Sequence, residues 1–524
     1  MSTNKYHLGD HNRAVARWAM LIGSATLVSR ILGFIRDVII ARLFGIYIYA
    51  QAFVIAFRIP NLFRDLVGEG AANAAIVPVL TEYSIKRSKE EFWELTNVLL
   101  NLLLVILSVI TFFGVLFAPL LVRLIAPGFM SSPEKLEVTI NLTRIIFPYI
   151  LLIGLAAYAM AVLNSLKNFA VSAFAPCLLN ISIIIFALLF GEGTKGLATG
   201  ILVGGILQLA VQVPVLYKKG FHAKLAMHFK HPGAIQVGKL MLPRLASSSI
   251  YQLNNFVDSI FGSLAAIVGD GGVAVLYFSY RLIQFPIGIF SNSLAQAILP
   301  TFSTQVLEEN QENLKVTLSW GLRIVFFVML PATVIFMVLA DRLVFTLFGG
   351  GKFDLASGLL TANALFYYSI GLSAYAGTKI LQSCFFALKD TVTPTKIAFL
   401  ALIMNIMLNA ILMFPLKIGG LALATSISGI ISFFFLFFIL KRKLGGFGEQ
   451  KVFPAFLRML AAAVCMAAVC FLVNRALNFI WALFCGVFSY IIFCFIFRVT
   501  ELKELMHWII KKNIKAPSWT THKH

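Results

Sequence analysis

The chain has 524 residues, of which 60% are hydrophobic and 12% are charged, and its mean hydropathy is +0.90. Soluble domains carry roughly 25% charged residues, so this composition excludes a soluble globular protein and indicates a membrane protein. The net charge of +21 could suit nucleic acid, but the lysines and arginines lie mainly in loops between apolar stretches. We therefore expect no nucleic-acid partner.

Apolar stretches long enough to cross a hydrocarbon core of roughly 30 Å recur along the chain. They predict an all-α polytopic membrane protein with about 14 transmembrane helices. In chain order, the expected spans are residues 16–44, 49–80, 95–125, 139–166, 170–191, 196–217, 237–267, 271–303, 316–347, 357–388, 395–415, 418–441, 453–473 and 476–497.

Two segments of the first half recur weakly in the second half. Residues 57–83 resemble residues 280–304, and residues 147–176 resemble residues 366–394. The matching segments fall in the second and fourth spans of each half, which predicts two pseudo-symmetric six-helix lobes related by an axis along the membrane normal.

These lobes divide the chain into three predicted parts. Residues 1–220 form an N-terminal lobe with a cationic cavity, and residues 221–445 form a C-terminal lobe. Residues 446–524 add two further helices and a basic tail, in which a short amphipathic helix near 501–512 would lie on the membrane surface.

The basic residues also predict an orientation. Roughly 25 of them lie in one set of alternate loops and at the two ends of the chain, against roughly 7 in the other set. The positive-inside rule then places both termini in the cytoplasm.

Within the first two expected spans, the apolar stretches 24–45 and 52–80 contain five arginines, namely Arg30, Arg36, Arg42, Arg58 and Arg64. An arginine at mid-bilayer costs about 2.5–3.5 kcal/mol on insertion scales, so it normally faces a cavity or a partner. Two aspartates in the same spans cannot neutralise five guanidinium groups. The excess charge predicts a water-filled cavity that binds an anion.

Other polar residues accompany these arginines. Asn61 shares a helix face with Arg58, and Arg281 adds a cation from the second lobe. Transporters built from repeats hold their substrate between the repeats, which fits a cationic site there. The alternative is that the arginines form structural ion pairs with Asp37 and Asp65, and Arg42 could instead extend to the outer interface.

A second polar group is expected in other spans. Asp258 is a lone acid in the seventh span, Asn405 and Asn409 share a face of the eleventh, and Thr425 lies in the twelfth. Their oxygens could bind a coupling cation, with Na⁺ preferred over H⁺. The alternative is a hydrogen-bond network between helices.

With SRILGFIRDVIIARLFG at 29–45 and AFRIPNLFRDLVGEGAANAAIVPVL at 56–80, the chain resembles the MurJ/MviN family of lipid II flippases. That family belongs to the multidrug/oligosaccharidyl-lipid/polysaccharide exporter superfamily. The resemblance implies a bacterial inner-membrane protein of peptidoglycan and cell-wall biogenesis. Its cargo would be lipid II, the undecaprenyl-pyrophosphate disaccharide-pentapeptide, moved from the inner to the outer leaflet by alternating access.

The resemblance also implies the site. The family's central-cavity arginines match Arg30, Arg36, Arg64 and Arg281, and neighbouring positions match Ser29, Arg58 and Asn61. The chain departs from the family at Gln51 and Tyr280, where members commonly carry acids. Both departures make the expected cavity more cationic.

Arginine suits the expected cargo because its planar fork donates two hydrogen bonds to a phosphate. The chain has no GxxxxGK[ST] phosphate loop, so we expect a transporter that is not an enzyme, driven by the membrane potential or a cation gradient. We expect no cofactor apart from Na⁺ as a coupling ion. Expected partners are lipid II, membrane phospholipids and cell-wall synthesis proteins.

Three alternatives stay open. The same fold could export another polyprenyl-linked glycan or an amphipathic compound, although drug export favours an acidic or apolar cavity. A membrane enzyme would need acids or histidines clustered at the interface, whereas the eight histidines lie in tails and loops. A non-transporting scaffold would leave the intramembrane arginines unexplained.

Overall fold

The computed structural model describes residues 3–63, 75–191, 193–225, 230–502 and 504, with the side chains of residues 3–19, 63 and 242–251 left out of the description. The described residues are almost entirely helical, and among them the only β-type pairing is a single bridge between Gly350 and Phe353. The predicted all-α fold class is confirmed.

The chain divides into two compact units, which are described separately. The first unit comprises residues 1–278, 347–358 and 413–418, and the second comprises the remainder. The helices of the first unit are α1 (Thr3–Phe44), α2 (Ile48–Phe63), α3 (Val77–Lys86), α4 (Lys89–Leu116), α5 (Ala118–Ile125), the 3₁₀ helix η2 (Pro127–Ser131), α6 (Pro133–Ile146), α7 (Tyr149–Ser165), α8 (Ala170–Phe190), α9 (Lys195–Ala210), α10 (Val213–Lys218), α11 (Pro232–Gly262), α12 (Ala265–Val268) and the beginning of α13 (Gly272–Pro286).

Apart from residues 347–358 and 413–418, the second unit holds the end of α13 and the elements that follow it. They are the π-helix η3 (Ile287–Ser291), α14 (Asn292–Leu307), α15 (Gln311–Val338), α16 (Ala340–Phe348), α17 (Leu355–Ile370), α18 (Leu372–Ala387), α19 (Val392–Leu444), α20 (Glu449–Ala476) and α21 (Phe479–Ile496). The N-terminal lobe predicted from the sequence repeats ends at residue 220, whereas the first stretch of the first compact unit ends at residue 278. A division by compactness does not test a division by sequence repeats, so the predicted lobes stay a prediction.

Within the described residues, nine helices are long and apolar enough to cross a membrane, or ten when the bent pair α17–α18 is taken as one span. One of them, α19, consists of two helices that meet at a break at Lys417, where φ is +51°, and these cover the two predicted spans 395–415 and 418–441. Helices α1, α2 and α11 occupy the other predicted spans. The middle of the second predicted span, residues 64–74, lies outside the described residues.

Local sequence explains where several helices begin and end. The Ser88 side chain accepts a hydrogen bond from the Glu91 amide at the beginning of α4, as an N-cap residue does. Gly445 ends α19 in the left-handed conformation that glycine tolerates, after three basic residues in the last turn. Such caps satisfy backbone groups that a helix leaves unpaired.

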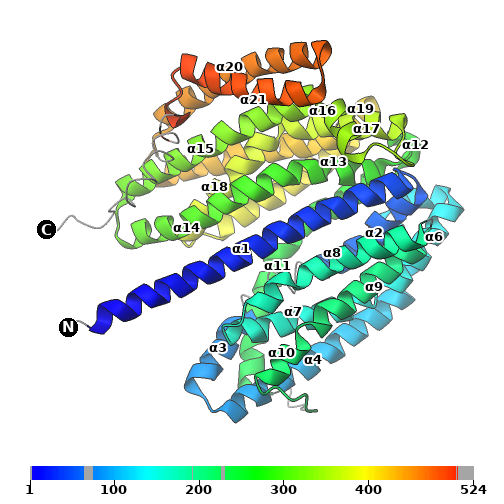
Figure 1. Cartoon of the computed structure of the whole chain (residues 1–524), viewed down its shortest axis with the longest axis vertical. Helices are drawn as coiled ribbons and strands as arrows, with labels where there is room; N and C mark the ends of the chain where they lie inside the picture. Colours follow the sequence, from blue (N-terminus) through cyan, green and yellow to red (C-terminus); the bar gives the residue numbers. More distant parts are fainter. Residues whose placement is uncertain (1–2, 64–74, 192, 226–229, 503, 505–524) are drawn as a thin grey trace. The chain divides into compact units, whose positions relative to one another are not determined.

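Small residues allow close helix packing in the first unit. Gly196, Gly200 and Gly204 line one side of α9 where it lies beside α8 (Figure 1). A Cβ atom at Gly200 would lie 2.7 Å from the Cα of Ile183, and one at Gly204 would lie 2.9 Å from the Cα of Leu179. This spacing of small residues is typical of interfaces between transmembrane helices.

In the second unit, α20 and α21 lie side by side as an antiparallel pair (Figure 1). The Tyr490 hydroxyl of α21 donates to the Phe327 carbonyl of α15 at 3.0 Å. Beyond α21, the fully buried Glu501 pairs with Arg323 of α15. The predicted amphipathic helix at 501–512 lies mostly outside the described residues.

The turn between α18 and α19 is fixed by Asp390. Its carboxylate accepts from the Thr393 amide at 3.0 Å and from the Lys443 ammonium at 2.9 Å. Burial acts to raise the pKa of Asp390, but the hydrogen bond from Lys443 and those from Thr393 outweigh it and lower that pKa to about 2. Asp390 therefore stays ionised throughout the neutral pH range.

Candidate functional site: arginines of the first unit

Two of the predicted binding residues, Arg30 and Arg36, lie on α1 in different environments. Arg30 is exposed, and in the described part of the chain no carboxylate pairs with it. Arg36 is only 4% exposed. The helix therefore presents one accessible guanidinium and one that is buried against neighbouring helices.

Arg36 is held by a network of four partners. Its Nε and Nη2 atoms donate to Asp37 Oδ1 at 3.0 and 2.7 Å, and Nη1 donates to Asn180 Oδ1 at 3.1 Å. Nη2 also lies 3.3 Å from the Tyr277 hydroxyl, which itself donates to Asp37 Oδ1 at 3.0 Å. The guanidinium carbon is 5.9 Å from the centre of the Phe57 ring.

This network joins α1, α2, α8 and α13. Because Asp37 is 1% exposed, its charge is compensated by Arg36 rather than by water. The conformation described here thus has Arg36 in the ion pair that the sequence offered as the alternative to substrate binding. A phosphate could reach Arg36 only after these contacts opened.

Asn180 links Arg36 to the backbone of Ser29, about two turns earlier on α1. Its Nδ2 donates to the Ser29 carbonyl at 3.2 Å while its Oδ1 accepts from Arg36. Gly33 lies opposite this amide, since a Cβ there would be 3.7 Å from Asn180 Nδ2. The backbone of α1 at Ser29 is therefore fixed by α8.

The cations of the second span are only partly described. Arg58 is half-buried on α2 and donates to the Ser259 hydroxyl of α11. Asn61 is half-buried one turn further along α2. Arg64 lies outside the described residues. Arg281 is half-buried on α13 in the second unit, so the joint site of the four predicted arginines stays a prediction.

The two departures from the family pattern have defined surroundings. The Gln51 side chain is 1% exposed and its Nε2 donates to Asp270 Oδ1 at 3.4 Å. The same oxygen accepts from Lys135 Nζ at 2.6 Å. Tyr280, in the second unit, contacts Tyr368 with the ring centres 5.4 Å apart and the rings tilted at 52°.

These contacts determine the charge at Asp270. Burial acts to raise the pKa of Asp270, but the Lys135 ammonium, the Gly271 amide and the Gln51 amide together hold it below its usual value. An acid in place of Gln51 would put a second carboxylate against this oxygen. Glutamine instead supplies a neutral donor.

Arg42 lies at the end of α1 and is exposed. Its Nη2 donates to the Leu347 carbonyl at 3.2 Å, and its own carbonyl accepts from the Lys352 amide at 2.8 Å. The Tyr47 hydroxyl donates to Asp354 at 2.6 Å nearby. The segment 347–358 is thereby attached to the turn that joins α1 and α2.

Three of the four predicted cation ligands hydrogen-bond to one another. Asn409 Nδ2 donates to Asn405 Oδ1 at 3.0 Å, and Asn405 Nδ2 donates to Thr425 Oγ1 at 3.1 Å. All three side chains are buried. Asp258 belongs to the first unit, and the described residues contain no group of three or more histidine, cysteine or acidic side chains placed to hold a metal.

Sequence reasoning missed Asn180, Tyr277 and Ser259 as members of this site. Asn180 was detectable, because it is a polar residue inside the apolar stretch FAPCLLNISII. Tyr277 and Ser259 gave no comparable signal, since tyrosine and serine are ordinary residues in membrane helices. Only the packing of α11 and α13 identifies them.

Comparison with known proteins bears on this arrangement. A family model described as lipid II flippase MurJ matches residues 40–492. A probable lipid II flippase MurJ of Buchnera aphidicola subsp. Acyrthosiphon pisum is 36% identical over 415 residues, covering 78% of this chain and 81% of that protein. A probable lipid II flippase MurJ of Vibrio cholerae is 33% identical over 437 residues, covering 81% and 83%.

A solved structure described as lipid II flippase MurJ, inward closed conformation, has a similar fold. Its TM-score is 0.79 at 28% identity, and the match covers 91% of this chain and 98% of that one. The family match extends over most of the chain and includes α2 to α20 in full. Together with the arginines of α1 and α2, it shows that the chain belongs to the lipid II flippase MurJ family of multi-pass bacterial inner-membrane transporters.

Proposed function

We propose that this chain flips lipid II from the inner to the outer leaflet, binding the pyrophosphate through arginines as the membrane-embedded lobes alternate their access. Family membership carries the proposal. The excess of arginine over acid in the first two spans supports it, because a pyrophosphate brings the negative charge that these cations lack.

Arg30 is the binding residue best supported by the described geometry. It is exposed on α1 and has no carboxylate partner in the described residues. Arg64 and Arg281 complete the proposed set. Arg36 takes a positioning role in this conformation, because Asp37 and Asn180 use most of its hydrogen-bond donors. Bidentate guanidinium contacts would select a phosphate over other polar groups.

The membrane potential supplies part of the driving force. Moving an anion outward along an inside-negative potential gains about 2.3 kcal/mol per charge per 100 mV. With the proposed orientation, both termini are cytoplasmic and the head group enters from the cytoplasmic side. Coupling to Na⁺ is the second proposed source, through Asp258, Asn405, Asn409 and Thr425.

The chemistry of that ligand set fits a hard cation. Asn409 Oδ1 is buried and accepts no hydrogen bond from the described residues, so it is an oxygen in need of a positive partner. Carbonyl and hydroxyl oxygens are the ligands that hard cations prefer. Transport by proteoliposomes in Na⁺ and in K⁺, with Asn409→Leu alongside, tests this. Equal rates in both salts would reject Na⁺ coupling.

The proposed function is tested by complementation in bacteria depleted of their own lipid II flippase. Arg30→Ala, Arg64→Ala and Arg281→Ala should each abolish rescue at matched membrane levels. Arg123→Ala is the matched control, because Arg123 is an exposed arginine on α5 that is not among the proposed binding residues. Rescue by all three variants would reject the arginine site while leaving flipping intact.

A direct flipping assay tests the identity of the cargo without depending on a bacterial host. Wild-type proteoliposomes should expose fluorescent lipid II to an added reagent in the opposite leaflet, and empty liposomes should not. If the chain moves another polyprenyl-linked glycan but not lipid II, the proposed cargo is wrong and the same-fold alternative takes its place.

A further inference from the structure

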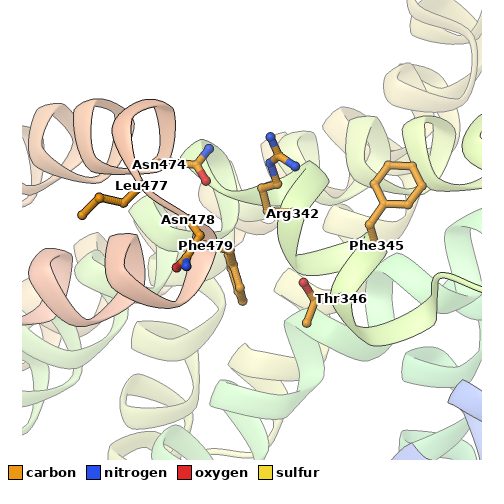
Figure 2. A pocket seen from close by; sticks show the side chains of 7 residues that line it. All are labelled: Arg342, Phe345, Thr346, Asn474, Leu477, Asn478 and Phe479. Carbon is orange, nitrogen blue, oxygen red and sulfur yellow. The ribbon is translucent and has the colours of Figure 1, made fainter.

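A pocket of about 370 Å³ lies within the second unit, between α16 and the turn that joins α20 to α21. Figure 2 shows the side chains that line it, with Arg342 on the side of α16 toward the turn and Phe345 on the side away from it. Its lining residues are Arg342, Phe345 and Thr346 of α16, and Asn474, Leu477, Asn478 and Phe479 of the turn. The volume falls within the roughly 300–1,000 Å³ of ordinary ligand pockets.

The pocket combines a cation with polar donors. Arg342 is exposed, and in the part of the chain that the structure describes no carboxylate pairs with it. Asn478 caps α21 by accepting from the Trp481 amide at 3.1 Å, so the positive end of that helix also faces the pocket. Both features favour an anionic group.

Asn474 requires a hydrogen-bond donor from the ligand, whereas Arg342 requires an anionic acceptor. The Asn474 Oδ1 is buried and accepts no hydrogen bond from the described residues. Leaving a buried acceptor without a donor is unfavourable. A ligand that satisfies the pocket therefore needs an anionic oxygen for Arg342 and a donor, such as a hydroxyl or an ammonium, for Asn474.

The position of the pocket at the end of α20 indicates which kind of ligand offers both an anionic oxygen and a donor. Helix α20 has 28 residues, a length of about 42 Å, and its first turn holds the Glu449–Lys441 ion pair. Its last turn, beside the pocket, therefore emerges at the opposite edge of a roughly 30 Å hydrocarbon core. Trp481, 55% exposed and next to the pocket, is typical of that interface.

Exposed apolar side chains continue from the pocket along α21, which runs back into the hydrocarbon core of the membrane. Leu477, Ile480 and Phe484 are all well exposed. In a membrane, such side chains contact acyl chains. The surroundings are thus polar at the pocket and apolar beside it, in the order of a phospholipid's head and tails.

We propose that this pocket binds one phospholipid head group, with its phosphate on Arg342 and its hydroxyl or ammonium on Asn474, so that the lipid joins α16 to the α20–α21 pair. Transport of lipid II is not needed for this binding. The site lies at the outer leaflet if the basic end of α19 is cytoplasmic.

Native mass spectrometry of the purified full-length chain tests the site. Phosphatidylglycerol, phosphatidylethanolamine, diacylglycerol and undecaprenyl phosphate are titrated separately. Hydrogen bonds to charged groups contribute about 1.5–3 kcal/mol, so Arg342→Gln should weaken the tightest phospholipid site by roughly tenfold or more. Asn474→Ala should weaken it as well, by a smaller factor.

Arg475→Gln is the matched control, because Arg475 is an exposed neighbour that does not line the pocket. It should change phospholipid binding by less than about twofold, as a screened surface charge does. Unaltered elution and melting temperature of each lipid-free variant would show that folding is intact.

Three results would overturn the proposal. Equal losses in Arg342→Gln and Arg475→Gln would mean diffuse attraction to charge, and diacylglycerol binding as tight as that of phosphatidylglycerol would mean apolar contact alone. An effect of Arg342→Gln on undecaprenyl phosphate only would assign the pocket to the polyprenyl carrier instead.

Discussion

Replacing Asp37 by asparagine should destabilise the chain strongly through Arg36. Asp37 is 1% exposed and Arg36 is 4% exposed, so the substitution leaves a buried guanidinium without its counter-charge. Breaking a buried ion pair costs about 3–5 kcal/mol. Asn180, Tyr277 and the Phe57 ring still contact Arg36, so we expect the lower end, about 3 kcal/mol.

The free energy of unfolding in mixed micelles, followed by tryptophan fluorescence, measures this loss. Tyr277→Phe is the first control, because it removes one hydrogen bond to Asp37 and should cost about 0.5–1.5 kcal/mol. The double variant Arg36→Met/Asp37→Leu removes both charges, and it should be more stable than Asp37→Asn alone.

A different ranking would refute the reasoning. If Asp37→Asn costs no more than Tyr277→Phe, the pair is hydrated in solution and Arg36 is accessible to a ligand. If the double variant is the least stable of the three, shape rather than charge holds α1 against α8 and α13.

Arg323→Ala should leave the fully buried Glu501 unpaired and lower the free energy of unfolding by about 3–5 kcal/mol, measured in the same micelles. Gly351→Ala should destabilise more than Gly191→Ala in a melting experiment. Both glycines have φ near +60°, which costs an alanine about 1–2 kcal/mol, but only at Gly351 would the new Cβ meet the backbone of α1. The pKa of Asp390 is lowered to about 2, below its unfolded value of about 3.9, so its contribution to stability is present above pH 4 and is lost as the pH falls toward 2. Asp390→Asn should remove that part of the acid dependence, and an unchanged acid profile would show that Asp390 does not titrate as described.

Periodicity and hydropathy were enough to predict the fold class, because a membrane leaves the chain few options. Backbone groups in a bilayer must be satisfied within the chain, so long apolar runs become helices. Element α19 illustrates this reasoning, since it consists of two helices whose break at Lys417 falls between the predicted spans 395–415 and 418–441.

The block around Arg30, Arg36 and Arg58 indicated the family, and the comparisons confirmed it. Which arginines are accessible could not be predicted in the same way. Arg30 and Arg36 are six residues apart, which puts them on different faces of one helix, but the spacing does not say which of the two is exposed and which is buried in an ion pair. Sequence spacing gives the face of a helix but not the partner packed against it.

Hydropathy, charge and the arginine-rich block were enough to identify a helical membrane protein of the lipid II flippase family with an excess of cations, because these features can be assigned residue by residue. The environment of each cation depends on the tertiary structure. Asn180 and Tyr277 come from α8 and α13, more than 140 residues away from Arg36, and their contacts convert a candidate phosphate ligand into part of a buried network. The physical reason is that pairing energy depends on which groups share a dry environment, and only folding brings them together.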